Sequence, residues 1–308
     1  MVVVFCRDPL EPSRPDRAFE AEVVAIEDRA LPYVLVDHDA LLREDEPAQA
    51  VRRVPGQPEP VLAAYRGWMV TPHQYRKLYE ALSAKNIRLI NDPEQYRHAH
   101  YLPENYPVIR GLTPRSAWLK GNLGMDRIME ALAPFGDVPV VVKNLVKSRK
   151  HEWAEACFIP SASDRGAVER VVTRFLGLQG DDLNEGLVFR EFVEFEPVGV
   201  HPRSGMPLTE EYRAFWLDGR PIFSSPYWAE GEYGSTEPPW GRNADVAADV
   251  RSRFFTMDLA RRRDGDWMIV ELGDAQVSGL PRGSDAGRFH GALREHWPEG
   301  VGPKRRGS

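Results

Sequence analysis

The stretch 254–274, FFTMDLARRRDGDWMIVELGD, is the part of this 308-residue chain that most constrains its fold. Asp264-Gly265 predicts a two-residue type I′ hairpin, because both central residues of that turn need positive φ. Such a hairpin places Asp258 directly across from Glu271 on one face of the strand pair. The other face then pairs Leu259 with Val270 and Met257 with Leu272, an apolar set that predicts a core face.

Two carboxylates in that arrangement suggest a cation. Directly opposed side chains have Cβ atoms about 4.5–5.5 Å apart, and like charges so placed repel unless a cation lies between them. Asp274 follows nearby, after Gly273, where the chain can turn. Hard oxygen ligands of this kind suit Mg²⁺. The alternative is a solvated polar face, neutralised by Arg262 and its neighbours.

Composition narrows the class of protein. A chain of 308 residues with 42% hydrophobic residues can bury a substantial core, as one large domain or two. The net charge of −6 argues against a general nucleic-acid-binding surface. Two cysteines without a metal-ligand pattern suit a reducing compartment, and no apolar run is long enough for a membrane span. We therefore expect a soluble cytoplasmic protein, of an oligomeric state that the sequence leaves open.

The first hundred residues alternate strand-like and helix-like segments, which predicts a mostly parallel α/β layer. Thr71-Pro72 and Asn91-Asp92-Pro93 are helix start signals. Prolines 103, 107 and 114 predict a linker over 101–115, followed by a short helix that starts at Thr113-Pro114. The predicted strands are 2–6, 33–36, 61–70 and 87–90, and the predicted helices are 16–30, 72–85 and a short one after residue 93.

Strands dominate from residue 137 onward, and one helix over 164–177 interrupts them, with Asp164 as its cap and Gly177 as its stop. Asp218-Gly219 predicts a second hairpin. The segment 226–246 is rich in Gly, Pro and Trp and predicts a long active-site loop. The predicted strands are 138–143, 155–160, 186–195, 211–217, 220–225, 254–262 and 267–272.

Three of these strands carry charged candidates. Lys143 ends an apolar run, and Lys147 and Ser148 follow it in a loop that predicts either a polyphosphate clamp or an ordinary basic turn. Glu191 shares its strand face with apolar residues, so it needs a partner, either an adenine amino group or a cross-strand arginine. Arg213 is predicted to bind phosphate or to form an ion pair, for example with Glu191.

The order of these features resembles the ATP-grasp superfamily. The features are a lysine that ends a strand, a basic loop, a strand with Glu-Phe-Val, a strand with Glu-Tyr-Arg, and Asp and Glu across a hairpin. The resemblance covers about 105–281, and the stretch 257–281, MDLARRRDGDWMIVELGDAQVSGLP, is similar to that family's metal-binding end. The chain resembles most a subgroup of bacterial and phage-associated ATP-grasp proteins.

The resemblance implies an α/β N-terminal layer followed by α+β ATP-grasp lobes that trap ATP between them. It implies a pre-ATP-grasp α/β domain over 1–105 and an ATP-grasp domain over 106–308, with lobes at about 106–185 and 186–290. The chain departs from the family pattern at Gly273, where Asn is usual, and in an early lysine, for which it offers His98, His100 or Arg110.

The resemblance also implies roles for the candidate residues. Those roles are Lys143 on the α- and β-phosphates, Lys147 or Ser148 in the loop over the phosphates, Glu191 and the backbone of Phe192 and Val193 at the adenine, Arg213 near the transferred phosphate, and Asp258 and Glu271, with Asp274 as the further candidate, on Mg²⁺.

The activity implied is an ATP- and Mg²⁺-dependent ligase. It would join a carboxylate to an amine through an acyl phosphate and release ADP and phosphate, acting on a small molecule or a peptide. Arg66 and Arg242 are the candidates for the substrate groove, against the alternative that each is a surface arginine. Two other functions remain open: a kinase or nucleic-acid end-joining enzyme, and a non-catalytic nucleotide-binding module.

Overall fold

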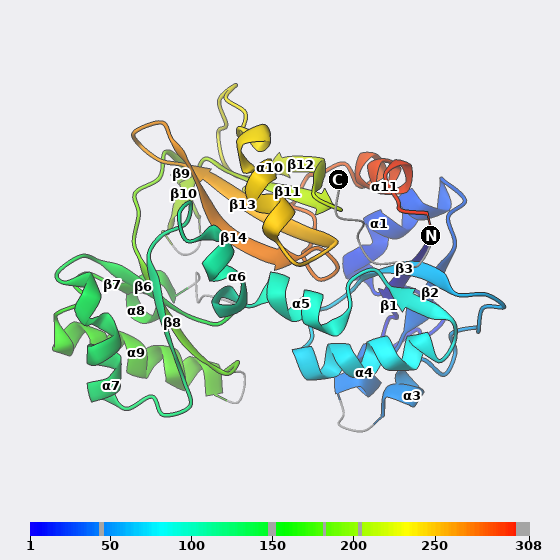
Figure 1. Ribbon diagram of the computed structural model, residues 1–308, viewed down its shortest axis with the longest axis horizontal. Helices are drawn as coiled ribbons and strands as arrows, with labels where there is room; N and C mark the ends of the chain where they lie inside the picture. Colours follow the sequence, from blue (N-terminus) through cyan, green and yellow to red (C-terminus); the bar gives the residue numbers. More distant parts are fainter. Residues whose placement is uncertain (43–45, 147–151, 181–182, 203–204, 300–308) are drawn as a thin grey trace.

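The computed structural model describes residues 1–42, 46–146, 152–180, 183–202 and 205–299, and within these ranges three four-stranded sheets carry the fold (Figure 1). A two-stranded sheet of β9 (Pro197–Val200) and β10 (Pro207–Thr209) adds to them. None of the helices in the described part of the chain combines the length and the apolar character needed to cross a lipid bilayer.

The first sheet is parallel throughout, with the order β2-β1-β3-β4, as the alternating sequence pattern predicts. Both helix start signals are confirmed, because Thr71 and Asp92 each form a capping box at the start of their helices. The elements are β1 (Val2–Cys6), η1 (Arg17–Phe19), α1 (Glu20–Glu27), β2 (Tyr33–Val36), α2 (His38–Leu42), α3 (Pro47–Ala50), β3 (Val61–Arg66), α4 (Pro72–Ser83), β4 (Ile87–Leu89) and α5 (Pro93–His100).

The second sheet has the order β5-β8-β6-β7 and packs against helices α7 and α9. Helix α9 starts at the predicted cap, Asp164, but it runs past the predicted stop at Gly177 and ends before Gly180, whose φ is +49°. The elements are β5 (Ser116–Lys120), α7 (Met125–Leu132), η2 (Ala133–Phe135), β6 (Val140–Asn144), α8 (Trp153–Ala156), β7 (Phe158–Ile159), α9 (Arg165–Gln179) and β8 (Gly186–Glu191).

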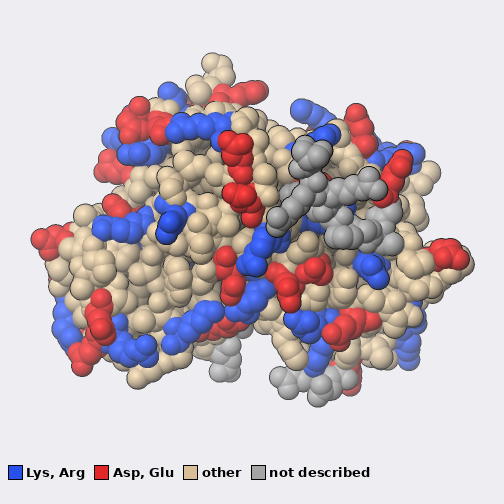
Figure 2. All heavy atoms as spheres, viewed as in Figure 1, with Lys and Arg blue, Asp and Glu red and all other residues tan. Residues whose placement is uncertain are grey.

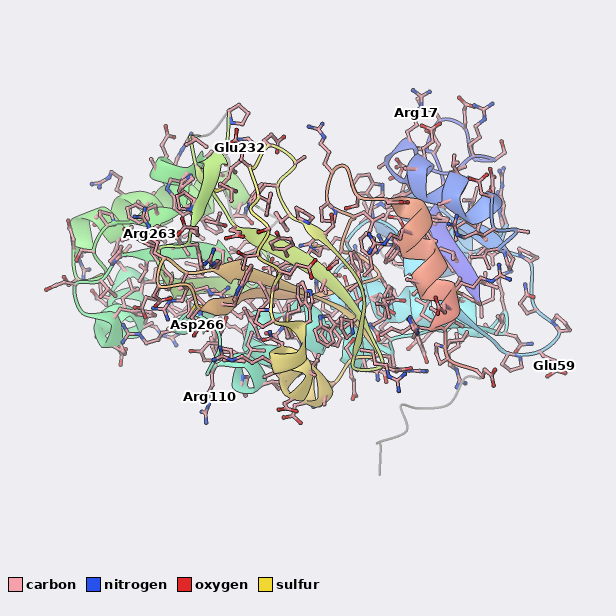
Figure 3. The ribbon with its side chains drawn as sticks, turned by 90° about the horizontal axis from the view of Figure 1, so that it is seen from above. Arg17, Glu59, Arg110, Glu232, Arg263 and Asp266 are labelled. Atoms are coloured by element: carbon pink, nitrogen blue, oxygen red, sulfur yellow. The ribbon has the colours of Figure 1, made fainter. Side chains whose placement is uncertain are left out.

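The third sheet is antiparallel, with the order β12-β11-β13-β14, and helix α11 lies beside α1 of the first layer (Figure 3). Asp218 and Gly219 both have positive φ, so the predicted two-residue hairpin turn there is confirmed. The elements are β11 (Glu211–Leu217), β12 (Arg220–Pro226), η5 (Trp240–Asn243), α10 (Ala244–Asp249), β13 (Phe254–Arg261), β14 (Trp267–Asp274) and α11 (Ala286–Glu295).

Three sequence predictions on the connections were wrong. The predicted linker over 101–115 contains helix α6 (Leu102–Ile109), which tolerates Pro107 within it. The predicted helix after Thr113-Pro114 is strand β5, because Trp118 and its neighbours pair with β8 and extend the second sheet. The predicted irregular segment 226–246 ends in η5 and the start of α10.

The β13–β14 hairpin pairs Asp258 with Glu271 and Met257 with Leu272, as predicted, although its predicted turn was wrong. Only Gly265 of the Asp-Gly pair has positive φ, at +88°, and the amide of Gly265 donates to the carbonyl of Arg262 at 2.9 Å. The loop therefore has three residues, 263–265, of the type I kind closed by a left-handed glycine.

A β-bulge compensates for this longer loop. The register shifts by one residue after Asp258, so Leu259 pairs with Ile269, and the predicted pair of Leu259 with Val270 was wrong. Val270 is the extra residue of β14. The loop and the bulge each add one unpaired residue, and together they restore the pairing of Asp258 with Glu271.

Candidate functional site

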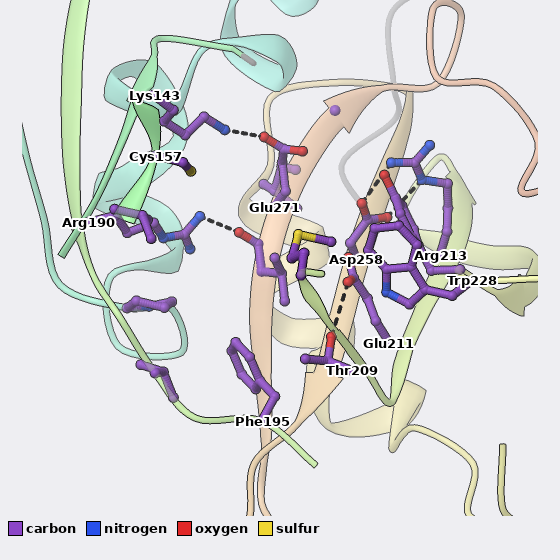
Figure 4. A pocket seen from close by; sticks show the side chains of 18 of the residues that line it. Lys143, Cys157, Arg190, Phe195, Thr209, Glu211, Arg213, Trp228, Asp258 and Glu271 are labelled. Carbon is purple, nitrogen blue, oxygen red and sulfur yellow. Dashed lines mark hydrogen bonds and ion pairs between the residues drawn. The ribbon is translucent and has the colours of Figure 1, made fainter. Parts of the chain in front are cut away.

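A cavity of about 650 Å³ lies between the second and third sheets, within the usual size range of small-molecule sites. Its wall takes side chains from β6, β8, β11, β13 and β14 and from the segments after β8 and β14. The residues that carry charge on this wall come from both sheets, so the cavity is shared between the two predicted lobes (Figure 4).

The two opposed carboxylates both face this cavity. Asp258 is almost fully buried, with 3% of its side chain exposed, whereas the side chain of Glu271 is 35% exposed. Each has a basic partner: Arg213 makes a bidentate pair with Asp258 at 2.8 and 2.7 Å, and the Lys143 ammonium contacts Glu271 (Figure 4). The repulsion between the carboxylates is therefore offset by cations of the chain itself.

Arg213 comes from β11, whose register places it directly beside Asp258 of β13. Burial opposes the charged form of Arg213, but the Asp258 carboxylate outweighs burial, and the net effect raises the pKa of Arg213 above its usual range. Its guanidinium also lies over the ring of Tyr227, 4.8 Å from the ring centroid. Arg213 thus stays cationic, and its ion pair is with Asp258 rather than with Glu191.

Lys143 lies one residue before the end of β6, close to the strand end that the sequence predicts. It crosses from the second sheet to Glu271 of the third sheet, with 9% of its side chain exposed. This ion pair therefore joins the two predicted lobes across the cavity.

Arg190 is a cavity residue that the sequence reasoning missed. From β8, its guanidinium reaches the third sheet and donates to the carbonyl oxygen of Val270, the bulge residue (Figure 4). It also contacts Thr113 Oγ1 and the carbonyl oxygen of Ile269, the latter at 3.3 Å. Burial lowers the pKa of Arg190 to about 10, so it is still charged at neutral pH. A charged residue inside the apolar run GLVFREF was the available signal.

The other end of the cavity is aromatic. The ring of Phe192 lies 5.1 Å from that of Phe158 and 6.0 Å from that of Trp153. Glu191 and Val193 line the same end. Glu191 pairs with Arg115 at 3.2 Å, which is the cross-strand arginine that the sequence offered as the alternative to adenine.

The amides at this end are partly occupied. The backbone N–H of Phe192 donates to the carbonyl of Pro139 at 2.9 Å. A base at this end of the cavity would therefore find the carbonyl of Phe192 and the backbone of Val193, but not the amide of Phe192.

Asp274 lies apart from the other two acidic candidates. It is fully buried and does not line the cavity; Asn91 and Gln276 donate to its carboxylate from 2.6 to 3.2 Å. Burial raises the pKa of Asp274 to about 7, although these hydrogen bonds oppose the shift. Asp274 thus joins the third sheet to the first layer rather than extending the acidic pair, because β14 directs its last residue to the opposite side from the cavity.

The two substrate-groove candidates also lie elsewhere. Arg66 is 1% exposed and forms a buried ion pair with Glu22 at 2.7 Å, so it holds α1 to β3 instead of facing a groove. Arg242 is exposed and pairs with Asp266 of the hairpin loop at 2.8 Å, the pairing expected of a surface arginine. Neither lines the cavity.

The remaining candidates divide into those that the structure places and those that it does not. Lys147 and Ser148 lie outside the described residues. Of the replacements for the early lysine, His100 lines the cavity, whereas His98 is buried and bonded to Arg251 at 3.1 Å. Arg110 points away from the body of the molecule (Figure 3).

The donor set at the acidic pair fits a hard divalent cation. Two carboxylates share one face, and the cationic groups of Lys143 and Arg213 already occupy it as stand-ins for positive charge. Within the described ranges, no three His, Cys, Asp or Glu side chains gather as a ligand cluster. A metal here would thus take other ligands as well, as Mg²⁺ does from phosphate oxygens and water.

Charge on the visible surface agrees with the composition. Figure 2 shows basic and acidic side chains interspersed over the viewed face. This mixture lacks the extended basic stripe that a nucleic-acid-binding face presents.

Comparison with protein families gives one match. The model of an ATP-grasp domain, the third family of its clade, matches residues 134–293, slightly more than half of the chain. No curated protein sequence matches the chain.

Solved structures share the fold at low identity. The RimK domain ATP-grasp protein of Sphaerobacter thermophilus is 14% identical, with a TM-score of 0.55 over 96% of this chain and 100% of that one. D-cycloserine synthetase DcsG is 14% identical, with a TM-score of 0.57 over 96% and 99%. The ATP-grasp ligase PsnB, complexed with a minimal precursor, Mg and ADP, is 13% identical, with a TM-score of 0.54 over 96% and 97%.

Proposed function

Because this chain belongs to the ATP-grasp domain family whose model it matches, we propose that it is an ATP- and Mg²⁺-dependent ligase. It joins a carboxylate to an amine or a similar nucleophile and releases ADP and phosphate. The predicted division into a pre-ATP-grasp domain over 1–105 and an ATP-grasp domain over 106–308 is part of this proposal.

One observation carries the proposal: a single cavity between two sheets combines an acidic pair with three cationic side chains. Asp258 and Glu271 supply the acidic face, and Lys143, Arg190 and Arg213 surround it. Phosphoryl transfer is catalysed mostly by positioning and by stabilisation of spread negative charge, and this arrangement suits both.

The reaction has two steps. In the first, a substrate carboxylate oxygen attacks the γ-phosphorus of ATP, and the bond from that phosphorus to the β–γ bridging oxygen breaks, so ADP leaves with the electron pair. In the second, the amine nitrogen attacks the acyl carbon, the bond from that carbon to the phosphate oxygen breaks, and the nitrogen loses a proton. The products are the amide, ADP and phosphate.

Each charged residue has a part in this scheme. Lys143 is proposed to turn from Glu271 to the α- and β-phosphates, and Arg213 to hold the transferred phosphoryl group. Mg²⁺, held by Asp258 and Glu271, supplies charge neutralisation between phosphate oxygens. Lys147 and Ser148, beyond the described residues, are proposed to cover the phosphates.

The aromatic end of the cavity is proposed to hold the adenine. Trp153 and Phe192 offer faces for stacking, and Glu191, Phe192 and Val193 lie at the same end. The amino group of adenine would compete with Arg115 for Glu191, whose side chain is one third exposed.

The substrate is proposed to be a small molecule or a peptide. Cycloserine synthetase is named for a small-molecule product, and PsnB is a ligase seen with a precursor. These names support the class of substrate only, and the acyl donor and acceptor are not assigned.

The test is ADP release by the Glu271→Ala variant, measured over a panel of amino acids and short peptides with Mg·ATP. We expect an intact fold by circular dichroism and a loss of turnover of at least about 100-fold, the scale of losing one preorganised charge contact. Asp126→Asn, at an exposed ion pair, is the control. Wild-type turnover in the Glu271→Ala variant would refute the metal assignment.

The products of the wild-type protein separate the alternatives. Formation of AMP would indicate adenylyl transfer, as in nucleic-acid end joining. ATP binding without any turnover over the whole panel would indicate a non-catalytic nucleotide-binding module.

A further inference from the structure

Gly273 occupies a position on the cavity wall where no other residue fits without displacing its neighbours. A Cβ built on Gly273 would lie 2.8 Å from Thr256 Oγ1 and 2.8 Å from Ser278 Oγ. The φ of Gly273 is not positive, so backbone conformation does not require glycine here. The space is kept for two hydroxyl groups, and Thr256 and Ser278 both line the cavity.

These hydroxyls lie on the same face as the acidic pair. Thr256 pairs with Gly273 and Asp258 pairs with Glu271, in neighbouring rungs of the β13–β14 ladder. Residues two apart on a strand share a face, so the space above Gly273 adjoins both carboxylates.

The hydrogen bonds fix the direction of both hydroxyl protons. Ser278 Oγ donates its one hydrogen to the carbonyl of Asp274 at 2.8 Å. In the 3.0 Å contact between the two hydroxyls, Thr256 must therefore be the donor. The lone pairs of Thr256 Oγ1 remain, and among the described residues no donor engages them.

We propose that Thr256 Oγ1 is a further oxygen ligand for a divalent cation held by Asp258 and Glu271, with Ser278 as the residue that orients it. This rests on the proposed function, which supplies the cation with the nucleotide. A hydroxyl with its proton turned away is a neutral hard donor, the kind that Ser and Thr supply to Mg²⁺ in other nucleotide sites. Thr256 is 1% exposed, so its position is fixed by packing before any ligand arrives.

The test is the affinity for Mn²⁺ in the presence of saturating ADP, followed by the electron paramagnetic resonance signal of free Mn²⁺. Thr256→Val keeps the shape of the side chain and removes the oxygen, and we expect it to weaken Mn²⁺ binding about 10-fold or more. Thr256→Ser keeps the hydroxyl and should retain wild-type affinity. ADP binding without metal should be the same in all three proteins.

Thr209→Val is the matched control, because Thr209 also lines the cavity but contacts Glu211, at 3.4 Å, instead of the acidic pair. Gly273→Ala is the second test variant: its added Cβ displaces both hydroxyls without removing either, so Mn²⁺ affinity should fall as well. This variant keeps the proposal testable if Thr256→Val does not fold.

The outcomes separate this inference from the proposed function. Wild-type Mn²⁺ affinity in Thr256→Val, or in Gly273→Ala should Thr256→Val not fold, overturns the role of Thr256 and leaves the ligase proposal standing. If the wild-type protein binds ADP with no dependence on Mn²⁺, the metal site of the proposed function fails and this inference fails with it. A loss confined to Thr256→Val and Gly273→Ala supports the inference.

Discussion

The guanidinium of Arg190 donates a hydrogen bond to the main-chain oxygen of Val270, the one residue of β14 that the bulge leaves without a partner on β13. A bulge interrupts the ladder and frees backbone groups that need other partners when they are buried. Arg190 supplies such a partner from β8 of the second sheet. The same side chain therefore completes the hydrogen bonding of the third sheet and ties it to the second.

Replacement of Arg190 by methionine should lower the free energy of unfolding by about 1–3 kcal/mol, the cost of buried acceptors left unsatisfied. Urea denaturation measures this change. Arg165→Met, which removes an exposed ion pair with Asp126, should change stability by less than about 1 kcal/mol. Equal effects of the two substitutions would show that the contacts of Arg190 contribute nothing specific.

Arg66 and Glu22 should behave as a coupled buried pair. Arg66→Met leaves the Glu22 carboxylate with His290 as its remaining side-chain partner at 2.9 Å, and we expect a loss of about 3–5 kcal/mol. The double variant Glu22→Leu, Arg66→Met removes both charges and should recover part of that loss. Thermal unfolding of the three proteins measures the coupling, and strictly additive losses would contradict it.

Asp274 should be required for stability rather than for metal binding. Its three hydrogen-bond donors are fixed by their other contacts: Asn91 Oδ1 accepts from the amides of Arg253 and Phe254, and Gln276 Oε1 accepts from that of Tyr65. Asp274→Asn would point an amide N–H₂ at a donor, at a cost of about 1–3 kcal/mol.

The measurement for Asp274→Asn pairs chemical denaturation with Mn²⁺ affinity in the presence of ADP. Stability should fall while the affinity stays at its wild-type value. A variant of unchanged stability that binds Mn²⁺ poorly would return Asp274 to the set of metal ligands.

His98 should make the protein less stable as the solution becomes acidic. Burial, assisted by the charge of Arg251, lowers the pKa of His98 to about 4 in the folded protein, whereas the unfolded chain keeps a value near 6.5. Between these values the unfolded state binds the extra proton. The contribution of His98 to stability is therefore complete above pH 6.5 and is lost as the pH falls toward 4.

The free energy of unfolding of the wild type and of His98→Gln, measured between about pH 4 and 7, isolates this effect. The other titrating groups cancel in the difference between the two proteins, so the difference should change with pH in that window. A difference that is constant over the window would mean that His98 titrates normally in the folded state.

The sequence carried the local signals well and the long-range ones poorly. Helix starts at Thr71, Asp92 and Asp164 follow from capping chemistry within a few residues, and all three are found. Strand β5 was taken for a helix because Thr113-Pro114 resembles a helix start, whereas its pairing with β8 depends on residues far along the chain. Local propensity does not report such pairing.

The candidate site shows the same division. Asp258 opposite Glu271 follows from hairpin parity, which holds although the turn type was wrong. The burial of Arg66 could not be foreseen, because its partners come from α1 and from the segment after β14. Arg190 was overlooked because attention went to the other face of its strand, where Glu191 lies.

The bulge at Val270 also shows which feature of the hairpin serves which purpose. If Val270 were removed, Ile269 would still face the core and the next residue, Glu271, would still stand opposite Asp258 in an uninterrupted ladder. What would disappear is the exposed main-chain oxygen that receives Arg190. The surplus residue is dispensable for arranging the acids and indispensable for fastening one half of the cleft to the other, so the rigidity of the closed cleft and the chemistry inside it can be altered independently.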